Sequence, residues 1–125
     1  MDKKGIEEVL QIYFDASYES DSAKMDRVFR PEAHIYGINE GGETLADFPK
    51  EQFVKLVGRA PKEPAPNHPR QDEIHFIEFS SDTTAVAKVS LTMPGTHFTD
   101  LLTFVYLDGE WRVIAKMFYG KPLEK

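Results

Sequence analysis

The sequence predicts an α+β domain in which three N-terminal helices pack on a strongly curved, mostly antiparallel sheet that encloses a cavity. The apolar residues recur every 3.6 positions in the first half of the chain and every second position after residue 70. The dipeptide Asp108-Gly109 separates two alternating stretches and is the strongest two-residue hairpin signal. A length of 125 residues fits a single domain, which we expect to span residues 1–125.

Three segments of the first half have the apolar spacing of amphipathic helices. The first covers residues 4–19. A short second helix can be capped by Asp21 or Ser22 and is expected to end at Pro31. The third begins near Pro49, because proline is well tolerated in the first turn of a helix.

Strands and loops are predicted for the remaining chain. An early strand covers residues 33–38 and is followed by a turn at 39–43. Four prolines among nine residues predict an extended loop at 61–69. Four further strands, joined by short turns, are expected at 72–79, 83–93, 97–107 and 110–119.

The two hairpin turns of the second half determine which side chains face the interior. With Asp108-Gly109 as the loop, Asp100 pairs with Met117, and with Pro94-Gly95 as the preceding turn, Val89 pairs with Asp100. Apolar neighbours on that side of the pleat mark it as the core face, so Asp100 is expected to point inward. The other side chains assigned to this face are Ala85, Ala87, Leu91, Phe98, Leu102, Phe104, Trp111, Val113, Ala115 and Tyr119.

The opposite face of the predicted sheet mixes apolar and polar side chains. Such a mixture is typical of a subunit interface, so we expect a homodimer formed through this outer sheet face. The alternative is a monomer in which a helix or the C-terminal segment covers the face. The residues concerned are Val86, Lys88, Thr92, Leu101, Thr103, Val105, Arg112, Ile114, Lys116 and Phe118.

Composition excludes several classes of partner. Acidic residues outnumber Lys and Arg by 21 to 15, for a net charge of −6, which argues against nucleic acid. There is no cysteine, and the four histidines show no metal-ligand spacing, so neither a metal nor a cofactor is expected. No apolar run is long enough to cross a membrane and no secretion signal is evident, which leads us to expect a cytoplasmic protein. No serine has an evident neighbouring base for nucleophilic catalysis.

Three stretches resemble one superfamily: FRPEAHIYG at 29–37, TTAVAKVSL at 83–91 and FTDLLTFVYLDGEWRVIAKMFYG at 98–120. They are similar to the nuclear transport factor 2-like superfamily, whose cystatin-like cone is shared by ketosteroid isomerase, scytalone dehydratase and SnoaL-like polyketide cyclases. The nearest resemblance is to its branch described as putative lumazine-binding. The resemblance implies a fold more than a chemistry, because this superfamily hosts many functions.

The isomerase-like members imply roles for two side chains. These enzymes hold an enolate oxygen with a tyrosine of the first helix and a neutral aspartic acid of a late strand. Tyr13 and Asp100 resemble that pair. The catalytic base of those enzymes would lie near the end of the first strand, where this sequence has Gly37 and therefore no carboxylate.

Other candidate site residues follow from the predicted faces. Asp100 can donate a hydrogen bond to a ligand as a neutral acid, or be a structural group bonded to Tyr13, Tyr36 or water. His34 and Tyr36 share one face of the first strand and can form an acid–base pair, unless that is the outer face. Val89 and Phe104 provide an apolar wall. An aromatic and thioether box for a flat ligand, or simply a core, is expected from Met93, Trp111, Met117 and Tyr119.

The function most consistent with these patterns is binding of an apolar or aromatic small molecule inside the cone. Asp100 and Tyr13 would be its polar anchors. The alternative is a cofactor-free isomerase, dehydratase or cyclase, with His34 as the base in place of the missing carboxylate. A third interpretation is a protein-interaction module whose working surface is the outer sheet face.

Overall fold

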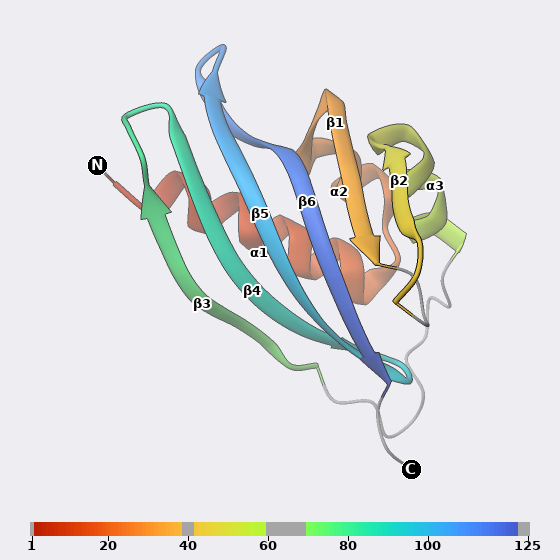
Figure 1. The fold of residues 1–125 in the computed structure, drawn as a ribbon. Helices are drawn as coiled ribbons and strands as arrows, with labels where there is room; N and C mark the ends of the chain where they lie inside the picture. The colour runs from red at the N-terminus through yellow and green to blue at the C-terminus, as the bar shows by residue number, and fades with distance from the viewer. Residues whose placement is uncertain (1, 39–41, 60–69, 123–125) are drawn as a thin grey trace.

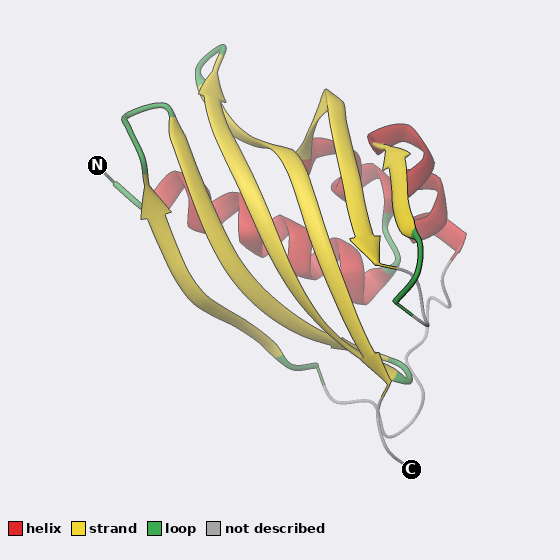
Figure 2. Ribbon diagram, in the orientation of Figure 1, coloured by secondary structure: helices red, strands yellow, loops and turns green. Residues whose placement is uncertain are grey.

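The computed structural model describes residues 2–38, 42–59 and 70–122, and these form three helices and six strands (Figures 1 and 2). The expected loop at 61–69 and most of the turn at 39–43 lie outside the described residues. The helices are α1 (Lys4–Glu19), α2 (Ser22–Val28) and α3 (Lys50–Arg59). The strands are β1 (Phe29–Ile38), β2 (Leu45–Pro49), β3 (Asp72–Phe79), β4 (Thr84–Met93), β5 (Thr96–Leu107) and β6 (Glu110–Pro122).

The six strands form one sheet in the order β2-β1-β6-β5-β4-β3. β1 and β6 run parallel, and the other neighbours are antiparallel. The sheet is curved, and α1 crosses one of its faces while α3 lies beside β1 and β2 (Figure 1). The predicted α+β architecture is therefore confirmed.

The helices begin and end close to their predicted limits. α1 buries the apolar stripe that its spacing predicted and ends at Ser20, whose φ of 54° is left-handed. The side chain of Asp21 then caps α2 by accepting a hydrogen bond from the Lys24 amide at 3.1 Å. α2 ends at Val28 rather than at Pro31, which lies inside β1. That position is tolerated because the pairing of β1 with β6 is irregular between Phe29 and His34, where no regular ladder is required.

β2 is a strand that the sequence did not predict. It has five residues, pairs only with β1 and forms an edge of the sheet. Its side chains alternate between exposed and half-buried, and none is fully buried. A strand with so little buried surface needs few apolar residues, so its sequence pattern is weak. β2 leads directly into α3 and so fixes where that helix begins.

Both predicted hairpin turns are present. Asp108 and Gly109 have φ values of 56° and 82°, as the two-residue turn requires, and Leu107 pairs with Glu110. Pro94-Gly95 joins β4 to β5 with Met93 opposite Thr96. The predicted pairing of Val89 with Asp100 is confirmed. Asp100 is 1% exposed and faces the interior as expected.

The register of β6 differs from the prediction because the strand contains a bulge. Phe104 pairs with Val113 but Thr103 pairs with Ala115, so one extra residue of β6 stands opposite β5. Beyond the bulge the inward and outward positions are exchanged. The predicted pairing of Asp100 with Met117 is therefore wrong, and Asp100 pairs with Phe118 instead.

The bulge reassigns five side chains of β6. Ala115 was assigned to the interior, but it pairs with Thr103 and His34 on the outer face. Lys116 is 7% exposed and Phe118 is half-buried on the inner face, although both were assigned to the outer face. Met117 and Tyr119 are 44% and 62% exposed on the outer face, although both were assigned to the interior. Phe98 accordingly pairs with Gly120 and not with Tyr119.

Gly37 makes room for the ring of Phe118. A Cβ atom at position 37 would lie 2.3 Å from the nearest carbon of that ring, which is far inside van der Waals contact. Residue 37 is buried, so a methyl group added there could not avoid the ring by turning toward solvent. The aromatic ring thus occupies the space that a side chain at this end of β1 would need.

Replacing Gly37 by alanine is expected to destabilise the fold by about 1–3 kcal/mol, because the added methyl group overpacks the space beside Phe118. Urea unfolding measures the change. Adding Phe118→Leu to Gly37→Ala should recover part of the loss, since leucine lacks the ring atoms that collide. Purely additive effects of the two substitutions would contradict this explanation.

Candidate functional site

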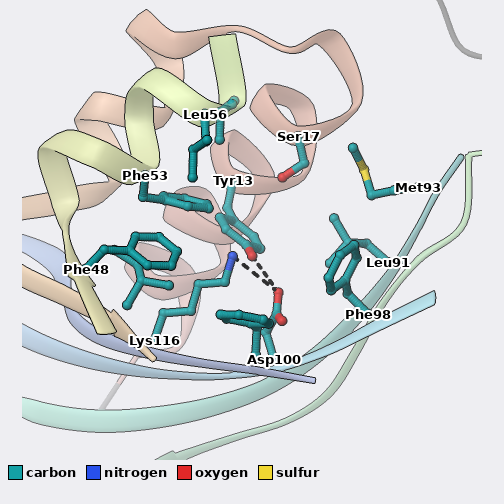
Figure 3. A pocket seen from close by; sticks show the side chains of 13 residues that line it. Tyr13, Ser17, Phe48, Phe53, Leu56, Leu91, Met93, Phe98, Asp100 and Lys116 are labelled. Carbon is teal, nitrogen blue, oxygen red and sulfur yellow. Dashed lines mark hydrogen bonds and ion pairs between the residues drawn. The ribbon is translucent and has the colours of Figure 1, made fainter. Parts of the chain in front are cut away.

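A pocket of about 260 Å³ lies between the inner face of the sheet and the helices α1 and α3 (Figure 3). Its walls are mostly apolar, which suits the body of an uncharged organic molecule. Leu56 of α3 lines the pocket and is 45% exposed, so it lies where the pocket meets solvent. Four phenylalanine rings contribute to the lining: Phe48, Phe53, Phe98 and Phe118.

Three polar side chains, which we call the polar cluster, meet inside this apolar pocket: Tyr13 of α1, Asp100 of β5 and Lys116 of β6. The hydroxyl of Tyr13 donates a hydrogen bond of 2.5 Å to Oδ2 of Asp100. Nζ of Lys116 lies 3.8 Å from the same oxygen, an ion-pair distance longer than a hydrogen bond. All three residues are buried.

The second carboxyl oxygen of Asp100 has no partner among the described residues. Oδ1 is buried and makes no hydrogen bond there. Buried polar atoms of native proteins are nearly always hydrogen-bonded, and an exception calls for an explanation such as a bound molecule. Because Asp100 lines the pocket, its free oxygen is available to a ligand placed there.

Burial changes the acid–base properties of two members of the cluster. It raises the pKa of Tyr13 well above its usual value, and the charge of Asp100 and the hydrogen bond to it act in the same direction. The phenol therefore stays protonated at neutral pH. Burial lowers the pKa of Lys116, and this effect outweighs the opposing attraction of Asp100. Lys116 consequently loses its proton more easily than an exposed lysine.

Aromatic rings hold the Lys116 side chain in place. Its Nζ lies 4.1 Å from the ring centroid of Phe53 and 5.0 Å from that of Tyr13. Cation–π contacts of this kind stabilise a desolvated ammonium group. The nitrogen is thus fixed between α1, α3 and the sheet, next to Asp100 (Figure 3).

The structure brings together two of the predicted site residues, Tyr13 and Asp100. Val89 and Phe104 are fully buried in the core, with Val89 directly across the strand from Asp100. Neither is among the residues that line the pocket. Both belong to the hydrophobic core of the domain.

The predicted aromatic and thioether box is not assembled. Met93 lines the pocket, but Met117 and Tyr119 point to the outer face because of the β6 bulge. Trp111 lies before the bulge and packs against Phe79 and Tyr106, with ring centroids 5.7 and 5.3 Å away. The placement of Met117, Trp111 and Tyr119 around one ligand was therefore wrong.

His34 and Tyr36 share one face of β1 as predicted, and that face is the outer one. Their rings stack at 6.0 Å, and Nδ1 of His34 lies 2.9 Å from a carboxyl oxygen of Asp47 on β2. Ala33 and Ile35 point inward, as the alternative interpretation held. Neither His34 nor Tyr36 lines the pocket, so His34 is not placed to act as a base there.

Lys116 and the aromatic residues of β2 and α3 were missed by the sequence analysis. Between Trp111 and Tyr119 both parities of β6 carry apolar side chains, so alternation alone does not decide which side faces the core. Apolar side chains at both odd and even positions were the one sign in the sequence that β6 is irregular. Phe48 belongs to the unpredicted β2, while Phe53 was assigned to the inner side of its helix but not to a site.

The structure also places a base beside a serine, contrary to expectation. Nε2 of His75 lies 3.0 Å from Oγ of Ser90, and its Nδ1 lies 2.8 Å from a carboxyl oxygen of Glu73. Glu73 and Ser90 are cross-strand partners of β3 and β4. Ser90 is only 6% exposed, which shields its hydroxyl from substrates. Glu73 and His75 are exposed, so we interpret the three residues as a surface hydrogen-bond network attached to the buried Ser90.

Neither a metal site nor a membrane-spanning helix is found among residues 2–38, 42–59 and 70–122. Within these ranges no group of three or more His, Cys, Asp or Glu side chains is arranged to hold a metal ion. None of the helices α1, α2 and α3 is long and apolar enough to cross a membrane.

A curved sheet with helices on one face and an apolar pocket between them defines the NTF2-like class of proteins. A solved NTF2-like protein of unknown function from Shewanella baltica OS155 superposes with a TM-score of 0.85 at 25% identity, covering 96% of this chain and 94% of that one. Another from Methylobacillus flagellatus KT gives a TM-score of 0.79 at 29% identity, over 94% and 90%. Within this class the chain belongs to the family described as "Putative lumazine-binding", whose model matches residues 1–119.

The chain is also similar to a protein named as an aldolase. The chain is 28% identical over 112 residues to a protein of Cladobotryum sp. named aldolase FrzH, which covers 88% of this chain and 84% of that protein.

Replacing Lys116 by methionine is expected to remove a pH dependence of stability. Because folding lowers the pKa of Lys116, the unfolded chain binds more protons between the folded-state and unfolded-state values, so stability rises with pH in that window. The free energy of unfolding of wild type should therefore increase relative to Lys116→Met as the pH rises from neutral toward the unfolded-state pKa of lysine, about 10.4. Urea unfolding at a series of pH values in this range measures the increase.

Lys55→Met is the matched control, since the side chain of Lys55 on α3 is 64% exposed. Its stability should change with pH in parallel with wild type. Parallel curves for wild type and Lys116→Met would contradict the assigned environment of Lys116.

Proposed function

We propose that this protein binds an apolar or aromatic carbonyl compound in its pocket and catalyses a cofactor-free aldol-type reaction on it. The observation that carries the proposal is the polar cluster of Tyr13, Asp100 and Lys116, buried in a pocket whose other walls are mostly apolar. Such pockets bind the body of a ligand by its apolar surface and orient it by a few polar groups. Perturbed acid–base groups inside a pocket are a mark of catalytic sites.

The cluster has the parts that cleavage of a β-hydroxy ketone requires. The carboxylate of Asp100 removes the proton of the β-hydroxyl group through its free oxygen Oδ1. The O–H electron pair forms a new carbonyl, the bond between the α and β carbons breaks, and its electrons form an enolate. The enolate takes the proton back at the α carbon. The products are an aldehyde and a ketone, and the reverse sequence forms the bond.

Each neighbour of Asp100 has a supporting role in this scheme. Tyr13 holds Oδ2 and so orients the carboxylate with Oδ1 toward the substrate. Lys116 brings a nitrogen to the carbonyl end of the substrate, where negative charge accumulates. The similarity to a protein named as an aldolase supports this class of reaction.

The isomerase route is less well supported than the aldol route. Gly37 supplies no carboxylate, and the ring of Phe118 takes up the adjacent space. His34, the alternative base, faces away from the pocket toward Asp47. Asp100 is therefore the base that the geometry favours.

Ligand binding without turnover is the second candidate function. The family description and the apolar lining of the pocket fit a binding protein. Tyr13 and Asp100 would then be the anchors of a bound molecule. The two functions are separated by whether a bound β-hydroxy ketone is cleaved.

Replacing Asp100 by asparagine should reduce cleavage of 4-hydroxy-4-phenylbutan-2-one by roughly 10²–10⁴-fold, because the amide keeps the shape of the carboxyl group but accepts no proton. Release of benzaldehyde, followed by absorbance, measures the rate. His34→Ala is the control and should match wild type, since His34 lies on the outer face.

A protein that is stabilised thermally by this ketone but never releases benzaldehyde would be a binding protein. Full activity in Asp100→Asn would contradict the catalytic role of Asp100. A wild-type protein that neither binds nor cleaves this ketone would contradict both functions.

We also propose that two copies of the chain associate through the outer sheet face. Lys88 of β4, Leu101 of β5, Met117 of β6 and Tyr36 of β1 form one cross-strand row on this face. Leu101 and Met117 are 43% and 44% exposed, and neighbouring Tyr119 is 62% exposed. Adjacent exposed apolar side chains of this size are typical of subunit interfaces.

Met117→Glu is expected to convert the dimer to a monomer, because it places two like charges in the centre of the interface. Size-exclusion chromatography with light scattering measures the mass. Gln52→Glu, which adds the same charge on α3, should leave the mass unchanged. A wild-type protein that is already monomeric at micromolar concentration would contradict the proposed interface.

A further inference from the structure

Lys116 has the environment of a reactive amine. It is the one lysine classed as buried among residues 2–38, 42–59 and 70–122. Asp100 and Tyr13 are the titratable groups that face it, and Phe53 covers it from α3. An amine must lose its proton before it can attack a carbonyl carbon, and removal of a lysine from water favours the neutral form.

The position of the nitrogen matches that chemistry. Nζ belongs to a side chain that lines the pocket, so a bound ligand can reach it. It lies 3.8 Å from Oδ2 of Asp100, a group that can relay protons, while the Tyr13 hydroxyl is bonded to the same oxygen. A nucleophile beside a proton-transfer group is the arrangement on which covalent catalysis by side chains depends.

We propose that Lys116 forms an imine with a ketone or aldehyde group of the substrate. This inference rests on the proposed function, because it assigns the covalent step of the same site. The neutral amine nitrogen attacks the carbonyl carbon, the π electrons of the carbonyl move to oxygen, and one proton passes from the nitrogen to that oxygen. The resulting carbinolamine takes up one further proton on its hydroxyl group and expels water. The amine and the carbonyl compound thus combine with one net proton to give an iminium ion and one water molecule.

The iminium ion explains how the carbon–carbon bond is weakened. Its positive nitrogen accepts the electron pair of the bond between the α and β carbons and becomes a neutral enamine. Asp100 takes the β-hydroxyl proton in the same step, as in the proposed function. The α carbon of the enamine then takes that proton from Asp100, which gives an iminium ion again and restores the carboxylate. Water hydrolyses this iminium ion to the amine of Lys116, the ketone and one proton.

The pocket also restricts the class of substrate. Among residues 2–38, 42–59 and 70–122, Lys116 is the one cationic residue that lines the pocket, and the imine uses that nitrogen. The described lining therefore offers no second cation to pair with a phosphate or carboxylate group of the substrate. The aromatic rings of Phe48, Phe53 and Phe98 favour an apolar or aromatic body. The substrate class is therefore an uncharged, apolar ketone or aldehyde.

Reductive trapping tests the imine directly. The full-length protein is incubated with 4-phenylbutan-2-one and sodium borohydride, which reduces an imine to a stable secondary amine. We expect one adduct per chain, with the mass of the probe less one oxygen atom, on the peptide that contains Lys116. Lys116→Met and Lys116→Arg should both lose this adduct, the second while keeping a cation in the pocket. Lys55→Met should retain it, because the side chain of Lys55 on α3 is 64% exposed and does not line the pocket.

A parallel measurement separates this inference from the proposed function. The alcohol 4-phenylbutan-2-ol has the same body but forms no imine, so its thermal stabilisation of the protein reports non-covalent binding only. Stabilisation by the alcohol and cleavage of the β-hydroxy ketone without any adduct on Lys116 would overturn the imine and leave the function standing. An adduct spread over exposed lysines, or retained in Lys116→Arg, would also overturn the imine. Absence of binding, cleavage and adduct together would overturn both.

Discussion

The β6 bulge is the constraint on which the chemistry of the pocket depends. One extra residue opposite Phe104 exchanges the two faces of the strand beyond it. Lys116 thereby faces the interior, where its nitrogen lies 3.8 Å from Asp100. In a regular strand the same position would hold Met117, and the carboxylate of Asp100 would face a thioether in place of a cation. Bulges often serve to redirect a side chain next to a functional site.

A buried cluster of three polar groups is costly for a small domain. Removal of a carboxylate and an amine from water is only partly offset by their mutual attraction, and apolar residues of similar volume would often be at least as stable. The hydrogen bond from Tyr13 offsets part of the cost at Oδ2, while Oδ1 stays without a partner among the described residues. An arrangement that stability does not favour is more readily explained by binding or catalysis.

The apolar side of the pocket is formed by an incompletely packed helix. α3 has no fully buried residue, yet Phe53, Leu56 and Val57 all line the pocket. A ligand between α3 and the sheet would bury apolar surface that the empty protein leaves partly exposed, and this burial favours binding. At the end of β1 the ring of Phe118 takes the space beside Gly37. The pocket therefore admits an apolar ligand beside α3 but has no room for a carboxylate side chain at position 37.

The sequence by itself determined the features that depend on local patterns. Helical spacing located α1, and the dipeptide Asp108-Gly109 located the last hairpin. The register set by the hairpin turns, together with the more apolar side of the pleat, placed Asp100 in the interior. Tertiary structure decided the rest. Where apolar side chains occupy both parities, as in β6, the facing of Lys116 depends on a bulge that only pairing with β5 and β1 reveals. The outward facing of His34 likewise follows from the pairing of β1 between β2 and β6, which joins segments far apart in the chain.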